Sequence, residues 1–283
     1  MTSVSGFAMT VFSSALPIVL AALGGLFTES AGSLSVALEG AMLAGAFASV
    51  AAAASTGSVA LAMLAALLAG SLVGILLGQV STRLRADVFV AGLAVNLLVP
   101  ALVALLSSAF FGTQGVVNLP VGIAGSALSF DALTALAIAG FGLLLWLAHD
   151  GSPLGLRLRA AGEKGEAAAA AGLDRDGLRR LAHLVAGGSA GLAGSWLALS
   201  VAAFVPGMSA GRGWIALVAI YLGGRRPLGI VLASLGFGLL LSLSNRAQSF
   251  ALFPPELLPA LPYLVTLAVY LFTLWRRSAR ARD

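Results

Sequence analysis

The 283-residue chain contains no cysteine and only two histidines. Without cysteine it can form no disulfide, and it offers no thiolate as a metal ligand or nucleophile. His149 and His183 lie far apart in the sequence and belong to no pattern of metal ligands. The chain also lacks a Gly-rich phosphate-binding loop and a nucleophile paired with a base. We therefore expect no metal site, no cofactor and no catalytic centre in it.

Charge is scarce as well. Charged residues make up 10% of the chain and hydrophobic residues 59%, with a mean hydropathy of +1.02, whereas a soluble domain carries roughly 25% charged residues. A segment such as 57–80 has only Ser, Gly and one Gln among its apolar residues, too few for the polar face of a soluble helix. The composition predicts an all-α, polytopic membrane protein embedded in a lipid bilayer.

Apolar runs between the charged residues mark the expected transmembrane helices, since a bilayer core of about 30 Å needs roughly 20 helical residues. The runs long enough to cross are 4–27, 57–80, 88–111, 129–149, 181–203, 227–244 and 259–275. Two further runs, 37–54 and 213–224, are shorter or broken by glycine. Together they predict about 8–10 transmembrane helices, some short or broken, in a single domain over residues 1–283.

Basic residues set the expected orientation, because loops rich in Lys and Arg stay in the cytoplasm. They cluster at Arg83 and Arg85, within 157–180, at Arg225 and Arg226, and within 276–282. The net charge of +5 therefore has a topological meaning and does not indicate nucleic-acid binding. The pattern places the C-terminus in the cytoplasm and, if 4–27 and 37–54 both cross, the N-terminus outside it. A re-entrant 37–54 would remove one crossing.

The longest polar stretch, at about 150–180, carries nearly balanced charges and is predicted to form two short helices. The first covers Glu163 to Ala171 and ends at Gly172, which can adopt the left-handed conformation. Asp174 can cap the second. One interpretation is a solvated loop. The other is a docking element, with a small, flat alanine surface that fits a groove on a cytoplasmic partner.

Four blocks of sequence resemble the permease subunits of bacterial ATP-binding-cassette (ABC) importers for ribose-type sugars, nucleosides and riboflavin. They are LAALGGLFTESAGSLSVALEGAMLAGAF (21–47), RADVFVAGLAVNLL (85–98), GLRLRAAGEKGEAAAAAGLD (155–174) and GMSAGRGWIALVAIYLGGRRPLG (207–229). The blocks occur in the family's order, and the chain most resembles the shorter permease of nucleoside-type systems. The resemblance implies a permease in the bacterial inner membrane.

The same resemblance implies a set of partners and a coupling helix. ATP and Mg²⁺ would be bound by partner ABC ATPase subunits. A second, different permease chain would complete the pathway, and an extracytoplasmic solute-binding protein would deliver the solute. The coupling helix that docks on the ATPase would comprise Glu163, Lys164, Glu166, Ala167, Ala168, Ala169, Ala170, Ala171 and Gly172.

Polar residues inside the apolar runs are candidates for the transport pathway. A carboxylate near the bilayer centre costs about 2.5–3.5 kcal/mol, so Glu39 needs a partner or a cavity. Either it accepts hydrogen bonds from a broken helix end, or it contacts the solute. The stretch 206–214 is a second interrupted helix entry, and two such entries indicate an internal repeat around a central site. The candidate pathway or pore-structuring residues are Glu39, Phe47, Asn96, Ser209, Arg212 and Trp214.

Several roles remain open for these residues. Arg212 could pair with Glu39 or with Glu29, and Asn96 could bridge helices or face the pathway. The favoured function is half of an ATP-driven import pathway for a nucleoside or similar small polar solute, with riboflavin or a simple sugar as the alternative. A secondary transporter driven by an ion gradient is the alternative of a different class. In such a carrier, Glu39 could couple ions, but the structured cytoplasmic segment would have no role.

Overall fold

Nine helices and one pair of two-residue strands form the described part of the chain, which in the computed structural model comprises residues 4–119, 140, 143–144, 147 and 152–248. Five of these helices are long and apolar enough to cross a membrane. They are α1 (Val4–Ser30), α2 (Leu38–Thr56), α3 (Val59–Thr82), α4 (Val88–Phe111) and α11 (Pro227–Gln248). The predicted polytopic helical architecture is confirmed.

Two further helices correspond to predicted runs that are less apolar or shorter. The run 181–203 forms most of α9 (Arg175–Ser200), and 213–224 corresponds to α10 (Arg212–Leu222). The strands β1 (Val117–Asn118) and β2 (Ala203–Phe204) pair antiparallel and are a minor departure from an all-α fold. The run 259–275, most of 129–149 and the C-terminus lie outside the described residues, so the total of 8–10 membrane helices stays a prediction.

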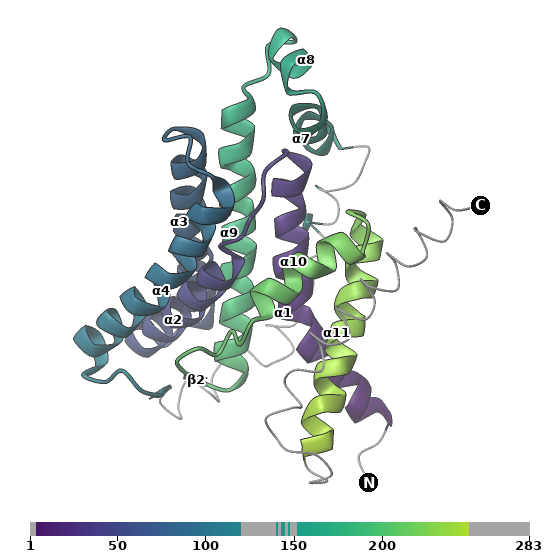
Figure 1. The fold of residues 1–283 in the computed structure, drawn as a ribbon. Coiled ribbons are helices and arrows are strands. Elements are labelled where there is room, and N and C mark those ends of the chain that lie inside the picture. The colour runs from purple at the N-terminus through teal and green to yellow at the C-terminus, as the bar shows by residue number, and fades with distance from the viewer. Residues whose placement is uncertain (1–3, 120–139, 141–142, 145–146, 148–151, 249–283) are drawn as a thin grey trace.

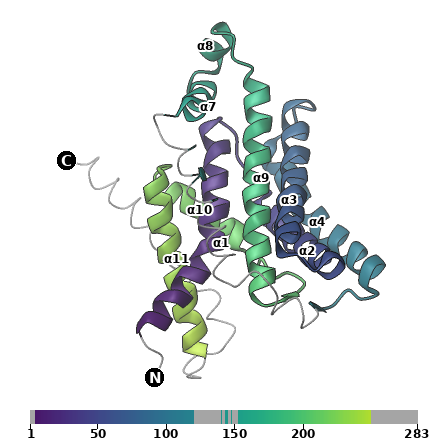
Figure 2. The ribbon, with the colours of Figure 1, turned by 180° about the vertical axis from the view of Figure 1, so that it is seen from behind.

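Helix α9 is the central helix (Figures 1 and 2). It stands between α2, α3 and α4 on one side and α1, α10 and α11 on the other, and it packs against α1, α2 and α3. Its buried face is made largely of Gly, Ala and Ser between Ala182 and Ala198. A Cβ added at Gly70 or Gly74 of α3 would collide with the backbone of α9. Glycine therefore permits the close helix contact that stabilises a membrane bundle.

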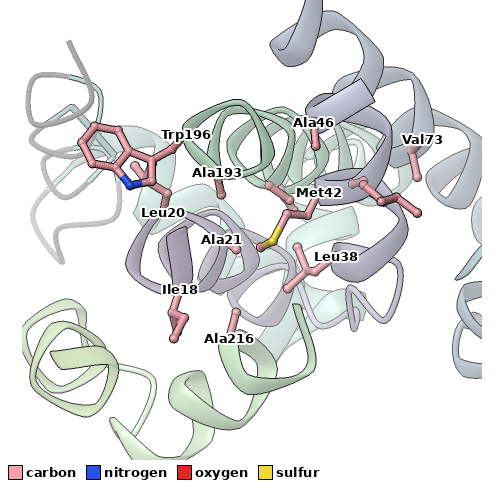
Figure 3. Close-up of a cluster of buried hydrophobic side chains, with 14 of the residues drawn as sticks. Ile18, Leu20, Ala21, Leu38, Met42, Ala46, Val73, Ala193, Trp196 and Ala216 are labelled. Carbon is pink, nitrogen blue, oxygen red and sulfur yellow. The ribbon is translucent and has the colours of Figure 1, made fainter. Parts of the chain in front are cut away.

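The main hydrophobic core lies where α1, α2, α9 and α10 meet (Figure 3). Its labelled side chains are buried: Ile18, Leu20, Ala21, Leu38, Met42, Ala46, Val73, Ala193, Trp196 and Ala216. The alanines keep the helices close together, and larger residues such as Met42 fill the space between them. At the edge of this core the indole Nε1 of Trp196 donates a hydrogen bond to the Ser13 carbonyl oxygen (3.3 Å).

The outer faces of α3 and α4 are apolar and exposed. Leu68 and Leu72 on α3 are 57% and 68% exposed, and Leu97 and Leu105 on α4 are 78% and 65% exposed. A surface this apolar over two adjacent helices is unfavourable in water but matches the hydrocarbon of a bilayer. These faces are the surfaces by which a membrane-spanning chain meets lipid or another membrane helix.

Three predicted basic clusters gather at one end of the bundle, from which α7 (Pro153–Glu163) and α8 (Gly165–Ala170) project (Figure 1). Arg83 follows the end of α3, where Gly78 approaches Arg180 of α9. Arg225 pairs with Glu29 in the last turn of α1. The first residues of α1 lie at the opposite end. If the basic end is cytoplasmic, as predicted, the N-terminus is extracytoplasmic.

Candidate functional site

The projecting segment begins with α7, a helix that the sequence analysis did not predict. Ser152 caps it by accepting a hydrogen bond from Gly155 N (3.0 Å), and Pro153 occupies the first turn, where a missing N–H does no harm. The helix ends at Glu163, and Lys164 leaves the helical conformation with φ −134° and ψ 66°. The prediction of one helix from Glu163 to Ala171 is therefore wrong at its start.

The turn after α8 has the predicted left-handed glycine and aspartate cap, but the helix after it is longer than predicted. Gly172 is left-handed at φ +80°, and Asp174 Oδ1 accepts a hydrogen bond from Gly177 N (2.9 Å), as expected. The predicted second short helix is wrong, because α9 continues without a break from Arg175 to Ser200. The projecting segment is thus joined directly to the central helix of the membrane bundle.

The tip of this segment is a small exposed surface. In α8, Ala168 is buried, whereas Glu166, Ala167, Ala169 and Ala170 are exposed. Glu163, Lys164, Ala171 and Gly172 are exposed beside them. Alanine loses little side-chain entropy when it is covered, so a partner can pack closely on such a surface. The residues predicted to form the coupling helix therefore lie together at the outermost point of the described bundle (Figure 1).

The projecting segment is fastened to the end of α1 by polar and apolar contacts. Arg179 of α9 donates hydrogen bonds to the carbonyl oxygens of Ala31 (3.3 Å) and Gly32 (2.7 Å). Gly32, at φ +67°, packs against Gly162, where a Cβ would come within 2.9 Å of the Gly162 Cα. Burial and, to a smaller extent, Arg175 lower the pKa of Arg179, but a guanidinium stays charged at neutral pH.

The second candidate region is the place where the first turns of α2 and α10 meet, here called the helix junction. Asn96 of α4 holds the start of α2: its Oδ1 accepts a hydrogen bond from Gly40 N (2.8 Å) and its Nδ2 donates one to the Val36 carbonyl oxygen (2.8 Å). A primary amide has both a donor and an acceptor, so one side chain satisfies two backbone groups of opposite character. In the structure, Asn96 bridges two helices.

Glu39 of α2 in turn holds the start of α10. Its two carboxylate oxygens accept hydrogen bonds from Gly211 N (2.9 Å) and Gly213 N (2.7 Å). Gly211, at φ +77°, provides no side-chain cap of its own, so the glutamate satisfies the free N–H groups of this helix end. The partial positive charge of the helix N-terminus favours the carboxylate there. The structure thus shows the hydrogen-bonding role considered for Glu39.

The other candidate pathway residues divide between the helix junction and the core. Ser209 is buried just before α10, and Arg212 Nη1 donates to the carbonyl oxygens of Met208 (3.1 Å) and Ser209 (3.3 Å). Trp214 lies half-buried in the first turn of α10. Phe47 lies elsewhere, with its ring packed edge-on against those of Phe111 and Phe204. Ser209, Arg212 and Trp214 thus lie at the helix junction with Glu39 and Asn96, whereas Phe47 packs in the core.

The helix junction lies about halfway along the membrane-spanning part of the fold. Eleven residues make α10 about 16 Å long, close to half of a bilayer core of about 30 Å. From the junction α10 runs alongside α1 to that helix's last turn, and Ala216 faces the middle of α1 near Ala21 (Figure 3). The starts of α2 and α10 therefore meet at this point. That they belong to an internal repeat around a transport site stays a prediction.

A third group of residues, here called the α10 joint, comprises Glu29, Tyr221 and Arg225. The Tyr221 hydroxyl donates a hydrogen bond to Glu29 Oε1 (2.5 Å), and Arg225 Nε lies 3.3 Å from Glu29 Oε2. The Arg225 guanidinium also lies 5.4 Å from the centre of the Tyr221 ring. Glu29 therefore pairs with Arg225, whereas the sequence analysis considered Arg212 for it. No local pattern signals this group, because Glu29 lies on α1 and Arg225 lies in the turn past the end of α10.

A cavity of about 790 Å³ lies beside the α10 joint at the end of the bundle that carries α7. Its charged and phenolic lining residues are Glu29, Arg159, Glu163, Tyr221, Arg225 and Arg226. Leu26, Phe27 and Leu158 provide apolar lining. The cavity therefore separates part of α7 from the end of α10 and leaves space between these two elements.

Residues 7–274 match the family described as the permease component of the branched-chain amino acid transport system. A nucleoside ABC transporter permease protein of Lactococcus lactis is 30% identical, over 97% of this chain and 93% of that protein. A putative glucose ABC transporter permease protein of Haloferax volcanii is 29% identical, over 99% and 94%. A guanosine ABC transporter permease protein of Bacillus subtilis is 31% identical, over 89% and 87%. No solved structure matches the chain significantly.

Proposed function

The chain belongs to the branched-chain-type permease family of ABC transport systems, and from this premise we propose that it forms half of an import pathway for a nucleoside or a similar small, neutral, hydroxyl-rich solute. A permease component is not the ATPase, so ATP is used by partner subunits. Membership of an ABC family speaks for ATP as the energy source and against the alternative of an ion-driven carrier.

The chemistry of the helix junction supports a neutral solute. The charge of Glu39 is directed at two backbone N–H groups, and Asn96 is engaged with two groups of α2. Arg212 is hydrogen-bonded to two carbonyl oxygens. A pathway near such a junction is weakly polar, which suits transient contact with hydroxyl groups better than capture of an anion. This observation carries the proposal that the solute is neutral.

The names of the relatives rank the candidate solutes. The Lactococcus and Bacillus proteins are named for a nucleoside and for guanosine, which puts nucleosides first. The Haloferax protein is named for glucose, which keeps a simple sugar as the second candidate. All of these compounds are neutral and rich in hydroxyl groups, in agreement with the helix junction.

The exposed tip at α8 supports the proposed contact with an ATPase. It is short, rich in alanine and joined to α9 by a tight turn, so a displacement of the tip can act on the central helix of the bundle. We assign Glu163, Lys164 and Glu166 to Gly172 to this contact. The remaining partners are a second permease, expected to be a different chain, and an extracytoplasmic solute-binding protein.

The proposal is tested on the complex that copurifies with this chain from its native membranes. The copurified solute-binding protein is offered uridine, guanosine, riboflavin, ribose and glucose, together with leucine and uridine monophosphate. Uptake of the bound compounds is measured in proteoliposomes supplied with ATP. We expect a nucleoside to bind, and uptake to stop with vanadate but to persist with an ionophore. Binding of amino acids or phosphorylated compounds alone would contradict the proposed solute. Uptake that stops with the ionophore but not with vanadate would contradict ATP coupling.

A further inference from the structure

Helix α10 is held at each of its ends by a glutamate from another helix. At its start the carboxylate of Glu39 accepts two backbone hydrogen bonds, and at its other end Glu29 binds Tyr221 and Arg225. We propose that the α10 joint is a positioning device, through which movement of the α7–α8 segment is passed along α10 to the helix junction. This inference rests on the proposed function, because it takes α8 as the contact with the ATPase.

The α10 joint is built to hold a fixed geometry. The side chain of Glu29 is only 7% exposed, so its carboxylate depends on Tyr221 and Arg225 for compensation. Arg225 has φ +58°, a conformation that non-glycine residues rarely adopt. It follows Gly224, at φ +65°, in the tight turn between α10 and α11, where Arg225 N donates to the Ile220 carbonyl oxygen (3.0 Å). The turn therefore fixes the direction from which Arg225 reaches Glu29.

Helix α10 can transmit a displacement because it is short and packed along its length. Its buried residues Gly213, Ile215, Ala216, Ala219 and Ile220 form one face, and α10 packs against α1, α2 and α11. A close-packed helix of eleven residues moves as a rigid body more readily than it bends. A shift of its Tyr221 end is therefore accompanied by a shift at Gly211 and Gly213, which Glu39 holds.

The α10 joint is also connected to the projecting segment. Glu29 lies in the last turn of α1, and the residues that follow it, Ala31 and Gly32, are held by Arg179 of α9. Phe27, Ala31, Leu158 and Ala182 form a small apolar cluster that ties α1 to α7 and α9. The cavity beside the joint leaves α7 and the end of α10 free of direct packing over part of their length. Movement of α7 thus reaches the end of α10 by way of the last turn of α1, where Glu29 holds Tyr221 and Arg225.

The absence of cysteine allows a direct test in the copurified complex. Ala210→Cys places a single thiol at an exposed position two residues before the start of α10. Its rate of reaction with a thiol reagent is measured without nucleotide, with ATP, and with ATP and vanadate. We expect the rate to depend on nucleotide in the parent chain. With Tyr221→Phe or Glu29→Gln added, the ratio of the rate with ATP to the rate without nucleotide should fall to about one, because Glu29 of α1 no longer holds the Tyr221 end of α10.

Uptake and ATP hydrolysis are measured on the same preparations. Uptake per ATP hydrolysed should fall about tenfold in Tyr221→Phe, the effect expected when one hydrogen bond to a charged group is lost. The amount of copurified ATPase should stay unchanged. Arg226→Gln is the matched control: it removes the neighbouring positive charge of the same turn, but the structure pairs Glu29 with Arg225 and not with Arg226. Its nucleotide response should match that of the parent chain.

Exchanging the charges of Glu29 and Arg225 distinguishes a positioning role of this pair from a general contribution to the stability of the fold. Glu29→Arg combined with Arg225→Glu restores the pair with reversed polarity and should regain part of the nucleotide response that Arg225→Glu alone loses. The inference would be overturned if Tyr221→Phe and Glu29→Gln both bound normal amounts of ATPase and both kept the parent's nucleotide dependence of thiol labelling. The proposed function would still stand. A parent complex without any ATPase would overturn the proposed function and the inference together.

Discussion

At the scale of single residues, the helix junction consists of polar side chains that satisfy backbone groups. Asn96 and Glu39 lie on different helices, and each caps the start of another broken helix. A free N–H or C=O group inside a bilayer costs several kcal/mol, so these two side chains make irregular backbone possible at this depth. The sequence alone left open whether they serve the fold or touch solute, because their partners at Val36 and Gly211 are distant in sequence.

Asn96→Asp is predicted to weaken the helix junction. Aspartate keeps an acceptor for Gly40 N but cannot donate to the Val36 carbonyl oxygen, and it brings a charge into the bundle. We expect the purified protein to lose about 1–3 kcal/mol of unfolding free energy, measured by denaturation in detergent. Asn118→Asp makes the same change at an exposed position of β1 and should be almost neutral. Equal loss in both variants would show that the contacts of Asn96 do not stabilise the fold.

At the scale of elements, glycine decides how closely α3 approaches α9. A Cβ at Gly74 would collide with the His183 carbonyl oxygen, whereas a Cβ at Gly236 of α11 would meet no atom within 4 Å among the described residues. Gly74→Ala should therefore destabilise the bundle by about 1–3 kcal/mol through overpacking. Gly236→Ala should be neutral or gain up to about 1 kcal/mol from its better helix propensity. Thermal unfolding of both variants in the same detergent tests this, and a stable Gly74→Ala variant would contradict the tight contact.

The projecting segment shows what local sequence can and cannot determine. Gly172 and Asp174 were predicted correctly because turn and cap chemistry depends on neighbouring residues. The break at Lys164 was missed. It lies between Gly162 and Gly165, and the contact of Gly162 with Gly32 depends on tertiary packing. The α10 joint was missed for a similar reason, since Glu29 and Tyr221 are joined only when α10 lies against α1.

Bulk at the tip of the projecting segment is predicted to block the ATPase without affecting the fold. Ala169 is exposed on α8, and Ala169→Trp would hold a closely packed partner away from this surface. We expect at least a tenfold loss of copurified ATPase, as about 1.4 kcal/mol of binding energy would produce, with normal membrane insertion. Val116→Trp adds the same bulk at the exposed residue before β1, which pairs with β2 at the end of the bundle away from α8 (Figure 1), and should leave ATPase recovery unchanged. Full recovery with Ala169→Trp would place the docking surface elsewhere.

At the scale of the whole molecule, the fold agrees with the rule that loops rich in Lys and Arg stay in the cytoplasm. The basic residues near Arg83, Arg180 and Arg225 come from separate segments, yet the structure gathers them at the end that carries α8. Charge counting alone predicted which loops share a side, because lipid and the membrane potential act on each loop separately. It could not place the start of α10 in the middle of the bundle, since that position depends on the cap that Glu39 supplies to α10.

The orientation of the whole bundle can be measured because the chain has no cysteine of its own. Thr56, at the turn between α2 and α3, and Leu84, after α3, are both exposed and lie at opposite ends of α3. With Arg83 and Arg85 in the cytoplasm, a membrane-impermeant thiol reagent should label Thr56→Cys in spheroplasts and leave Leu84→Cys unlabelled. Permeabilised cells should show equal labelling and so control for reactivity. The reverse pattern would place α8 outside the cell, out of reach of any ATPase, and would reject the coupling role together with the orientation.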